Sequence, residues 1–517
     1  MPTPAGLRPA TAPGAALETL AALAGVTDLP LAGRGLWVSG VALDSRAVQP
    51  GDLYAALPGS HAHGAEHVGQ AAGAGAVAVL TDPQGAARCA DLTVPILVCP
   101  HPRAVLGPLA AQVYGHPARD LLVLGVTGTN GKTTTTFLLD AALRAAGWRT
   151  GLIGTVQTRI ADTHLPSLHT TPEAPDLHCL LALMREQAVQ ACSIEVSSQA
   201  LAQHRVDALV VDVAGFTSFS QDHLELHGDM ASYLDAKALL FTPQHSRHAV
   251  VVIDDDGGRA IAERASVPVT TLSAREDTGA DWWVHDRLTD GHGTCFVLSH
   301  RGAQPALSLR CALPGDFNVM NTALAALMLV TAGIDGADVV DGLAQAEGVP
   351  GRMERVSAGA PDEPLAIVDY AHTPQAVARA LHALRTMVPA GRLIVVLGAG
   401  GDRDPGKRAG MGAAAATWAD VVLVSDDNPR SEDPGAIRAA VLAGARAVGG
   451  GATILEVGER RDAIRQAVDL AGAGDVLLVA GKGHEQGQEV GGVRHPFDDR
   501  VELARALAQR RTAGHPT

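Results

Sequence analysis

The sequence has few cysteines, and none are spaced as a metal-binding or redox pair. The six are Cys89, Cys99, Cys179, Cys192, Cys295 and Cys311, and they form no CxxC motif. This spacing implies neither a zinc site nor a disulfide framework. We therefore expect small, reduced core residues in a cytoplasmic protein.

The sequence also lacks long apolar segments and an excess of basic residues. No stretch approaches about 18 consecutive apolar residues, so no membrane-spanning helix is expected. Residues 1–16 are rich in Pro, Ala and Gly and contain no basic stretch followed by an apolar one, which predicts a disordered tail and not a signal peptide. The 40 basic and 55 acidic residues give a net charge of −15, which argues against non-specific binding to nucleic acid or anionic membranes.

What the sequence does contain is alternating apolar strands and helical patterns, which predict an α/β fold. At roughly 150 residues per domain, its 517 residues predict about three domains. Turn clusters around residues 114–117 and 348–351 divide the chain into a smaller α/β domain (17–118), a doubly wound parallel sheet (119–350) and a Rossmann-like domain (351–517). The expected strands are 76–80, 94–98, 121–126, 208–213, 249–253, 365–368, 393–397, 421–424 and 476–480.

The sharpest motif is a phosphate-binding loop that follows the strand at 121–126. It contains Gly128, Thr129, Asn130, Gly131, Lys132 and Thr133. Glycines let backbone N–H groups face phosphate oxygens, Lys132 can neutralise phosphate charge, and the Thr133 hydroxyl suits Mg²⁺. Val126 stands where the strict pattern has its first glycine, and the plain alternative is a glycine-rich turn between strand and helix. The loop alone predicts ATP or GTP binding without naming a reaction.

The form Gly-Thr-Asn-Gly-Lys-Thr resembles the loop of the Mur ligases and the folylpolyglutamate synthetases. Further segments narrow the resemblance to the Mur ligases that add the third residue of the peptide, and they span about residues 30–505. These segments are Asp44-Ser45-Arg46, Glu195-Val196-Ser197-Ser198, Gln203-His204-Arg205, Asp222-His223-Leu224, Asp369-Tyr370-Ala371-His372, Asp427-Asn428-Pro429-Arg430 and Gly481-Lys482-Gly483-His484-Glu485.

The resemblance implies an ATP-dependent ligase of peptidoglycan precursor synthesis. It would join a diamino acid to UDP-N-acetylmuramoyl-L-alanyl-D-glutamate through an acyl phosphate and release ADP and phosphate. Catalysis of this kind relies on positioning and charge neutralisation. The implied partners are small molecules only, with ATP and Mg²⁺ as cofactors and a monomeric, cytoplasmic enzyme.

The resemblance also implies roles for individual residues. Lys132, Lys237 and His223 are the implied catalytic residues, and Thr133, Glu195, His223 and a carbamylated Lys237 the implied Mg²⁺ ligands. Helical periodicity alone would make Lys237 a solvated surface residue, and Glu195 has the alternative of a solvated charge. Besides the loop, the implied ATP-binding residues are Asn318, Asn321, Arg352, Asp369 and His372. Helix caps for the two asparagines and a turn for Asp369 are the alternatives.

Two further sets concern the other substrates. The implied residues for the UDP substrate are Ser45, Ser60, His61, Ala62, Thr170, Thr171, Ser197, Gln203 and Arg205. Those for the incoming amino acid are Arg403, Asp427, Asn428, Pro429, Arg430, Gly481 and Glu485. A guanidinium suits bidentate binding of a carboxylate, so Arg430 favours meso-diaminopimelate, whose distal centre carries one.

Several alternatives stay open at this point. The same ligase could add L-lysine or L-ornithine, which lack the distal carboxylate. More remote alternatives are a folylpolyglutamate synthetase, the ligase that adds the terminal dipeptide, and a P-loop nucleotide switch without catalysis. A switch would bind nucleotide without substrate-dependent phosphate release.

Overall fold

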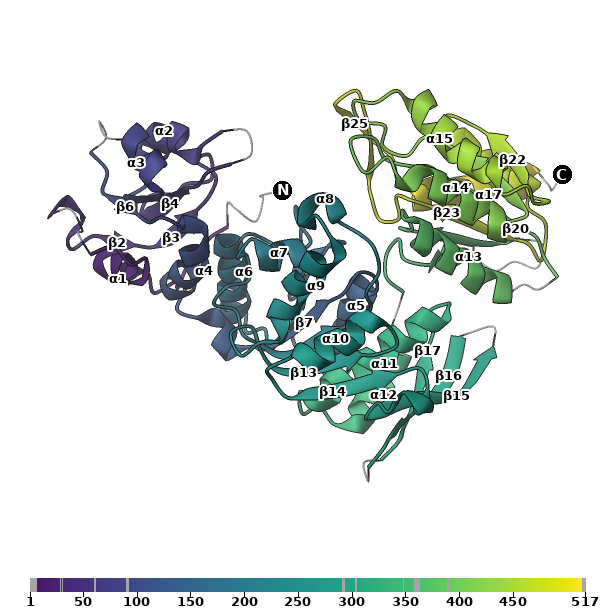
Figure 1. Ribbon diagram of the computed structural model, residues 1–517, viewed down its shortest axis with the longest axis horizontal. Coiled ribbons are helices and arrows are strands. Elements are labelled where there is room, and N and C mark those ends of the chain that lie inside the picture. The colour runs from purple at the N-terminus through teal and green to yellow at the C-terminus, as the bar shows by residue number, and fades with distance from the viewer. Residues whose placement is uncertain are drawn as a thin grey trace. The chain divides into compact units, whose positions relative to one another are not determined.

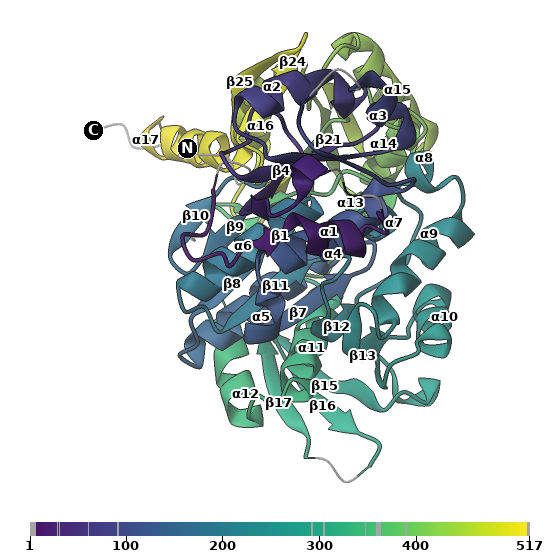
Figure 2. The ribbon, with the colours of Figure 1, turned by 90° about the vertical axis from the view of Figure 1, so that its left-hand side faces the viewer.

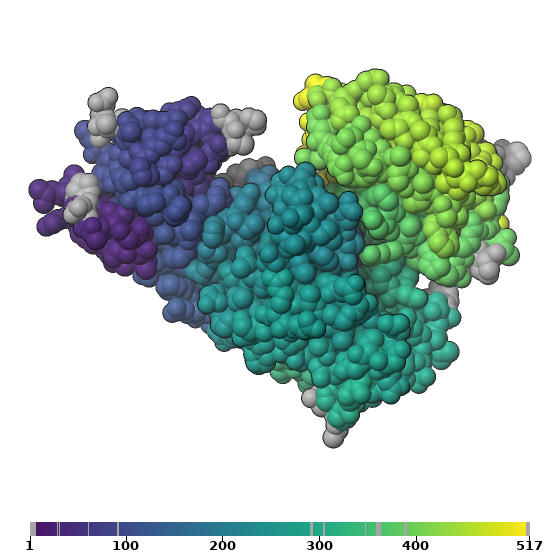
Figure 3. Space-filling view, viewed as in Figure 1, coloured from purple at the N-terminus to yellow at the C-terminus, as the bar shows by residue number. Residues whose placement is uncertain are grey.

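The computed structural model describes residues 7–27, 29, 31–59, 62–89, 93–290, 293–302, 305–346, 348–357, 363–387 and 390–513. The chain divides into two compact units. The first comprises Met1–Leu288, Cys295–Arg310 and Met320–Ala346, and the second Thr289–Thr294, Cys311–Val319 and Glu347–Thr517. Figure 1 labels their elements, and Figure 3 colours their surfaces by residue number.

The N-terminal part of the first unit is built on a parallel sheet in the order β3-β4-β5-β6. One of its two cores is completed by Cys179 and Ala182 of helix α6. Its elements are β1 (Ala15–Ala16), α1 (Leu17–Leu23), β2 (Trp37–Val38), β3 (Gly40–Ala42), β4 (Asp52–Ala56), α2 (Val68–Gly73), β5 (Ala78–Thr81), α3 (Pro83–Arg88), β6 (Ile96–Val98) and α4 (Pro102–Val113).

The predicted disordered tail is wrong for residues 7–16. Arg8 Nη2 lies 2.6 Å from Asp52 Oδ2, which is almost fully buried, and β1 pairs with β2. Gly14 N also donates to Val113 O at 3.1 Å. A buried carboxylate needs a cationic partner, and Arg8 supplies it. Residues 1–6 lie outside the described residues.

The central sheet has the order β10-β9-β8-β11-β7-β12-β13-β14-β15-β16-β17. Neighbours from β8 to β15 are parallel, and β9 and β10 are antiparallel. Figure 2 shows β8, β11, β7, β12 and β13 in this order. The elements are β7 (Leu122–Thr127), α5 (Lys132–Ala145), β8 (Thr150–Ile153), β9 (Thr158–Ile160), β10 (Thr163–Leu165), α6 (Ala174–Glu186), β11 (Ala191–Glu195), α7 (Ser198–Ala202), β12 (Val211–Phe216), α8 (Leu224–His227), α9 (Met230–Ala238), β13 (Ser246–Val252), α10 (Asp256–Arg264), β14 (Val269–Ser273), β15 (Trp282–Asp290), β16 (Gly293–His300), β17 (Leu307–Cys311), α11 (Asp316–Thr331) and α12 (Gly336–Ala344).

Helices cover both faces of this sheet, which confirms the doubly wound prediction. Residues of α6, α7 and α10 share one apolar core with β7, β11, β12 and β13. On the other face, α11 packs closely against β12, since a Cβ on Gly215 would lie 2.4 Å from Met328 Sδ. Helix α5 packs against α12. Strands buried on both faces read as continuous apolar runs, which is why they were visible in the sequence.

Some predicted details differ. The strand expected at 208–213 begins later, at Val211, because Ala208 has a positive φ of 63° and forms part of a turn. Five cysteines are buried and free as expected, but free Cys295 is exposed because it occupies an outward-facing position of β16. Among the described residues, no helix is both long and apolar enough to cross a membrane.

The second unit has a sheet in the order β18-β19-β23-β20-β21-β22, parallel except for β18. Alternate residues of β20 face two cores: Leu393 and Val395 pack with α13, α14 and α15, whereas Ile394 and Val396 pack with α16 and α17. The elements are β18 (Glu354–Arg355), β19 (Leu365–Asp369), α13 (Pro374–Met387), β20 (Leu393–Leu397), α14 (Lys407–Trp418), β21 (Val421–Val424), α15 (Pro434–Ala447), β22 (Thr453–Glu456), α16 (Arg460–Leu470), β23 (Val476–Ala480), β24 (Gly487–Val490), β25 (Val493–Pro496) and α17 (Asp499–Ala513). The division into three domains at about residues 118 and 350 stays a prediction.

Candidate functional site

The phosphate-binding loop connects β7 to α5 at the carboxyl edge of the central sheet. A Cβ on Gly128 (φ 142°) would lie 1.9 Å from Thr217 Oγ1, and one on Gly131 (φ 92°) would lie 2.5 Å from Asn321 Oδ1. Only glycine fits both positions. Lys132 Nζ donates to the carbonyls of Gly128 (2.9 Å) and Thr129 (3.0 Å), so its ammonium lies over the loop. The loop and the first turn of α5 therefore present N–H groups and a positive charge to an anion.

A carboxylate with two hydroxyl groups lies beside this loop. Thr133 Oγ1 donates to Glu195 Oε2 at 3.0 Å, and Thr155 donates to Glu195 through its Oγ1 (3.0 Å to Oε2) and its N (2.8 Å to Oε1). Glu195 ends β11 and is 1% exposed, so the solvated-charge alternative is wrong. These hard oxygen donors fit Mg²⁺. Within the described ranges, no three His, Cys, Asp or Glu side chains are grouped to hold a metal, so hydroxyl, carbamate, phosphate or water oxygens would have to complete the shell.

Lys237 is buried against the same loop. Its side chain is 1% exposed, and Nζ donates to Gly128 O at 2.8 Å and lies 4.5 Å from the centre of the Tyr233 ring. No ion pair to Lys237 occurs among the residues the structure describes. Burial, followed by the charge of Lys132, lowers the pKa of Lys237 well below its usual value, although Asp222 opposes this. The surface position expected from helical periodicity is therefore wrong: α9 turns this residue toward the loop.

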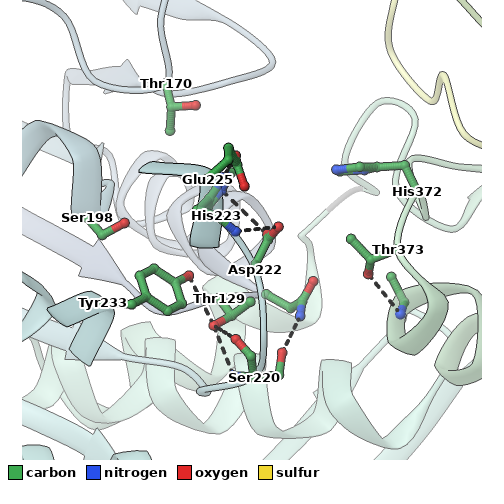
Figure 4. A network of polar contacts seen from close by, with 12 residues as sticks. Thr129, Thr170, Ser198, Ser220, Asp222, His223, Glu225, Tyr233, His372 and Thr373 are labelled. Carbon is green, nitrogen blue, oxygen red and sulfur yellow. Dashed lines mark hydrogen bonds and ion pairs between the residues drawn. The ribbon is translucent and has the colours of Figure 1, made fainter. Parts of the chain in front are cut away.

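His223 directly precedes α8, and Figure 4 shows its side chain beside Asp222 and Glu225. It has a positive φ of 55°, and its ring lies between Asp222 (Nε2 to Oδ2, 3.4 Å) and Glu225 (Nδ1 to Oε1, 3.5 Å). Its ring centre is 6.3 Å from that of Tyr233, whose hydroxyl lies 3.2 Å from Thr129 Oγ1. The structure thus brings His223 to the network around the loop, without a described contact to Glu195 or Lys237.

The residues expected to hold the muramoyl dipeptide surround the end of β11. Thr171 Oγ1 donates to Glu195 O (2.8 Å) and accepts from Ser197 N (3.0 Å). Buried Arg205 donates to Thr171 O (3.2 Å) and Gln203 Oε1 (2.8 Å). Thr170 Oγ1 lies 3.0 Å from Thr155 Oγ1. This predicted set is brought together beside the candidate metal ligands.

Sequence reasoning missed two residues here. Thr155 holds both oxygens of Glu195, and a Cβ on the preceding Gly154 would lie 2.3 Å from Glu195 Oε1. Glu173 lies 3.0 Å from Arg205 Nε and accepts from Arg103 Nη1 of α4 at 2.7 Å. The glycine before Thr155 was the available signal for the first. Glu173 had none, because its partners are far away in the sequence.

The expected uridine residues lie in the N-terminal part of the first unit. Ser45 is buried and its Oγ donates to Gln70 Oε1 at 2.9 Å, and Ala62 O accepts from Gly59 N at 3.0 Å. Ser60 and His61 lie outside the described residues. Ser45 and Ala62, the two members of this set besides the dipeptide residues that the structure describes, have no described contact with the phosphate-binding loop.

In the second unit, the expected ATP residues gather at the end of β19. Asp369 is buried and accepts from Met353 N and Ala371 N, both at 2.8 Å; the second is a local turn contact, and the first joins it to the segment before β18. Burial raises its pKa, opposed by Arg352. The Arg352 guanidinium lies 4.4 Å from the centre of the Tyr370 ring, and His372 Nδ1 lies 2.8 Å from Tyr370 O. Asn318 Nδ2 donates to Pro314 O at 2.7 Å, whereas Asn321 belongs to the first unit.

The loops after β21 and β23 carry the expected amino-acid residues except Arg403, which follows β20. Lys482, which sequence reasoning left out of the site, joins them: it is fully buried, and Nζ donates to Asn428 Oδ1 (3.0 Å) and Glu485 Oε2 (2.9 Å). Asn428 Nδ2 donates to the same Glu485 oxygen at 2.8 Å. A Cβ on Gly481 (φ 121°) would lie 2.4 Å from Asp427 Oδ2, so the loops are closely packed. Because β21 and β23 flank β20, the topology brings both loops to one edge of the sheet.

The remaining two arginines differ in their surroundings. Arg430 Nη1 donates to Gly401 O at 2.6 Å, and its backbone N donates to Glu489 O at 3.0 Å, directly after Pro429. Arg403 is exposed and has no hydrogen bond or ion pair within the described part of the chain. The structure therefore places Arg430, and not Arg403, in a defined geometry.

Three family models match the chain. The Mur ligase middle domain matches residues 126–329, the Mur ligase glutamate ligase domain residues 351–483, and the Mur ligase family catalytic domain residues 38–114.

Curated relatives match nearly the full length. The UDP-N-acetylmuramoyl-L-alanyl-D-glutamate--2,6-diaminopimelate ligase of Streptomyces avermitilis is 51% identical over 495 residues, covering 95% of this chain and 96% of the relative. The UDP-N-acetylmuramyl-tripeptide synthetase of Leifsonia xyli subsp. xyli is 45% identical over 516 residues, covering 98% and 99%.

Solved structures agree in fold. A structure of a UDP-N-acetylmuramoyl-L-alanyl-D-glutamate--2,6-diaminopimelate ligase is 32% identical with a TM-score of 0.68, covering 96% of this chain and 99% of that one. The MurF ligase from Thermotoga maritima in complex with ADP is 18% identical with a TM-score of 0.63, covering 92% and 99%. At this lower identity, the likeness shows the fold alone.

Proposed function

Because the chain belongs to the Mur ligase family, we propose that it is an ATP-dependent ligase of the MurE type that joins meso-2,6-diaminopimelate to UDP-N-acetylmuramoyl-L-alanyl-D-glutamate. The observation that carries the proposal is the identity of 51% across 95% of the chain to a relative named for this reaction. The convergence of Thr133, Glu195 and Lys237 on the phosphate-binding loop supports it.

The proposed roles follow the three matched segments. The N-terminal segment with Ser45 takes the uridine nucleotide, the central segment takes ATP and the dipeptide end, and the C-terminal segment takes the amino acid. In the reaction, a carboxylate oxygen of D-glutamate attacks the γ-phosphorus of ATP, and ADP leaves. The amine of the diamino acid then attacks the acyl phosphate carbon, loses a proton, and displaces phosphate.

The residues of the phosphate-binding loop act by positioning and charge. Lys132 lies over the loop, where its ammonium would meet the oxygens of the transferring phosphoryl group. Thr133 and Glu195 would hold Mg²⁺, which, when bound, neutralises phosphate charge. Glu195 is held by Thr155 on both oxygens, so its carboxylate keeps one orientation. Ser197, Thr171 and Arg205 lie next to it and would orient the D-glutamate end.

Lys237 supplies the second acidic group as a carbamate. Its lowered pKa favours the neutral amine, which attacks the carbon of CO₂ and releases one proton. The product carries a negative charge and two oxygens, and it would lie beside the Lys132 ammonium instead of repelling it. This change turns a buried amine, which has no ion pair among the described residues, into a ligand suited to a cation.

The amino acid would bind between the loops after β21 and β23. Arg430 would take the distal carboxylate of diaminopimelate and Glu485 the distal ammonium, with Asn428 between them. L-lysine and L-ornithine offer no carboxylate to Arg430. This is the feature that favours diaminopimelate over them.

The test is ATP-dependent phosphate release with UDP-N-acetylmuramoyl-L-alanyl-D-glutamate and each diamino acid in turn. We expect release with meso-diaminopimelate and at most weak release with L-lysine or L-ornithine. Strong release with lysine would keep the ligase and refute the role of Arg430. No release with any of them, together with ADP binding, would favour the nucleotide switch.

A further inference from the structure

Arg430 has a strained backbone that a neighbouring hairpin holds in place. Its φ of 52° is a conformation that residues other than glycine seldom adopt and that persists when the surroundings enforce it. The hairpin β24–β25 provides this support: Arg430 N donates to Glu489 O (3.0 Å), and Gly491 N donates to Arg430 O (2.7 Å). The backbone of Arg430 therefore pairs with β24 like one residue of an added strand.

The same hairpin contacts the rest of the loop that carries Arg430. Gln488 Nε2 donates to Asp427 O at 2.8 Å, and Glu489 N donates to Asn428 Oδ1 at 3.0 Å. Asn428 in turn contacts Lys482 and Glu485. The hairpin is thus the third element of this site, beside the loops after β21 and β23, and no motif in the sequence pointed to it.

The side chain of Glu489 also acts on the guanidinium. Its Oε2 lies 3.3 Å from Arg430 Nε, while Arg430 Nη1 donates to Gly401 O at 2.6 Å. A guanidinium has five N–H donors in one plane. Contacts at Nε and Nη1 fix that plane from two sides, and within the described residues Nη2 has no partner. Nη1 keeps its second N–H and Nη2 both of its own, and these donors can meet a ligand carboxylate.

We propose that Glu489 is a positioning residue for Arg430: the hairpin β24–β25 holds the guanidinium so that its Nη1–Nη2 edge meets the distal carboxylate of the amino-acid substrate. This inference rests on the proposed function. The ion pair itself is half-exposed, with 43% of the Glu489 side chain accessible, so it contributes little to folding. Its effect is on orientation, which binding of a planar carboxylate requires.

The test measures steady-state phosphate release for Glu489→Asp, Glu489→Gln and Glu489→Lys. We expect Glu489→Gln to raise the KM for diaminopimelate about three- to tenfold, with kcat and the KM values for ATP and the UDP substrate changed by less than about twofold. Glu489→Asp keeps the charge and should raise this KM less than Glu489→Gln does. Glu489→Lys should raise it more, because the introduced ammonium repels Arg430. A purely structural role would not confine the change to one KM.

Glu456→Gln is the matched control. Glu456 Oε1 pairs with Arg438 Nε at 2.9 Å, its side chain is 44% exposed, and it lies on β22 of the same unit outside the site. We expect its kinetics to match the wild type. A lower KM for diaminopimelate in Glu489→Gln would mean that Glu489 competes with the substrate, and an unchanged KM would mean that it does not position Arg430. Either result overturns the inference about Glu489 and leaves the proposed function standing. A wild-type protein without diaminopimelate-dependent phosphate release would overturn the proposed function as well.

Discussion

The buried amino group of Lys482 offers a quantitative test of how the two loops of the second unit are joined. Lys482→Met removes the ammonium but keeps an unbranched apolar stem of similar volume. It breaks the contacts to Asn428 Oδ1 and Glu485 Oε2 and leaves Glu485 without its cation. Removing one partner of a fully buried pair costs about 3–5 kcal/mol. The Glu485 side chain is 30% exposed and keeps part of its hydration, so we expect about 2–3 kcal/mol.

The assay is urea unfolding monitored by hydrogen exchange in peptides from β21 and β23, which report on the second unit alone. With a slope of about 2 kcal/mol per molar, the midpoint should fall by about 1 M. Adding Glu485→Gln to Lys482→Met should restore part of the loss, because the double variant leaves no uncompensated charge. An unchanged midpoint in Lys482→Met, or a double variant that loses the sum of both single effects, would refute the reasoning.

Three further predictions concern the first unit. Lys237→Ala should lower kcat about ten- to hundredfold, with partial rescue by short-chain carboxylic acids in place of the carbamate; full activity without them would rule the carbamate out. Thr133→Val, which removes the hydroxyl 3.0 Å from Glu195 Oε2, should raise the Mg²⁺ concentration needed for half-maximal phosphate release, and an unchanged Mg²⁺ titration would contradict its role as a ligand. Burial lowers the pKa of His178 from 6.5 to about 4. Between these two pH values the unfolded chain binds a proton on this side chain and the folded chain does not. The free energy of unfolding therefore falls as the pH falls through this window, by about 2 kcal/mol at pH 5. His178→Gln should remove that loss, as judged from urea midpoints at pH 7 and pH 5. An equal fall of the midpoint between these pH values in the wild type and the variant would contradict the prediction.

Much of the fold was predictable because its signals are local. The strand at Leu122–Thr127 is buried on both faces and therefore reads as an apolar run, and the glycines that follow it are required by the backbone itself. The strand that begins at Val211 was placed three residues early, because the turn at Ala208 has no glycine or proline to mark it. The ordered segment at residues 7–16 was missed for a different reason: Arg8 meets Asp52 only through the tertiary fold.

The residues of the candidate site also differ in whether local sequence could reveal them. Gly128, Lys132 and Thr133 were found from the sequence because a strand, a turn and a helix N-terminus place them in one short stretch of chain, whereas the metal role of Glu195 came from the resemblance. Lys482 was missed although it stands next to Gly481, which was named, and Glu489 although it lies four residues after Glu485. Their partners, Asn428 and Arg430, lie more than fifty residues away, and nothing in the local pattern joins them.

The sequence by itself determined the α/β architecture, the phosphate-binding loop and the resemblance to the Mur ligases, since these depend on periodicity and on residues in consecutive order. The tertiary structure alone decided which charges are buried and what each one meets. Lys237 shows the difference: its helix reads as amphipathic with a surface lysine, yet packing of α9 against the loop removes its amine from water and places it 2.8 Å from Gly128 O. Burial is a property of everything that packs around a residue, and those neighbours come from distant parts of the chain.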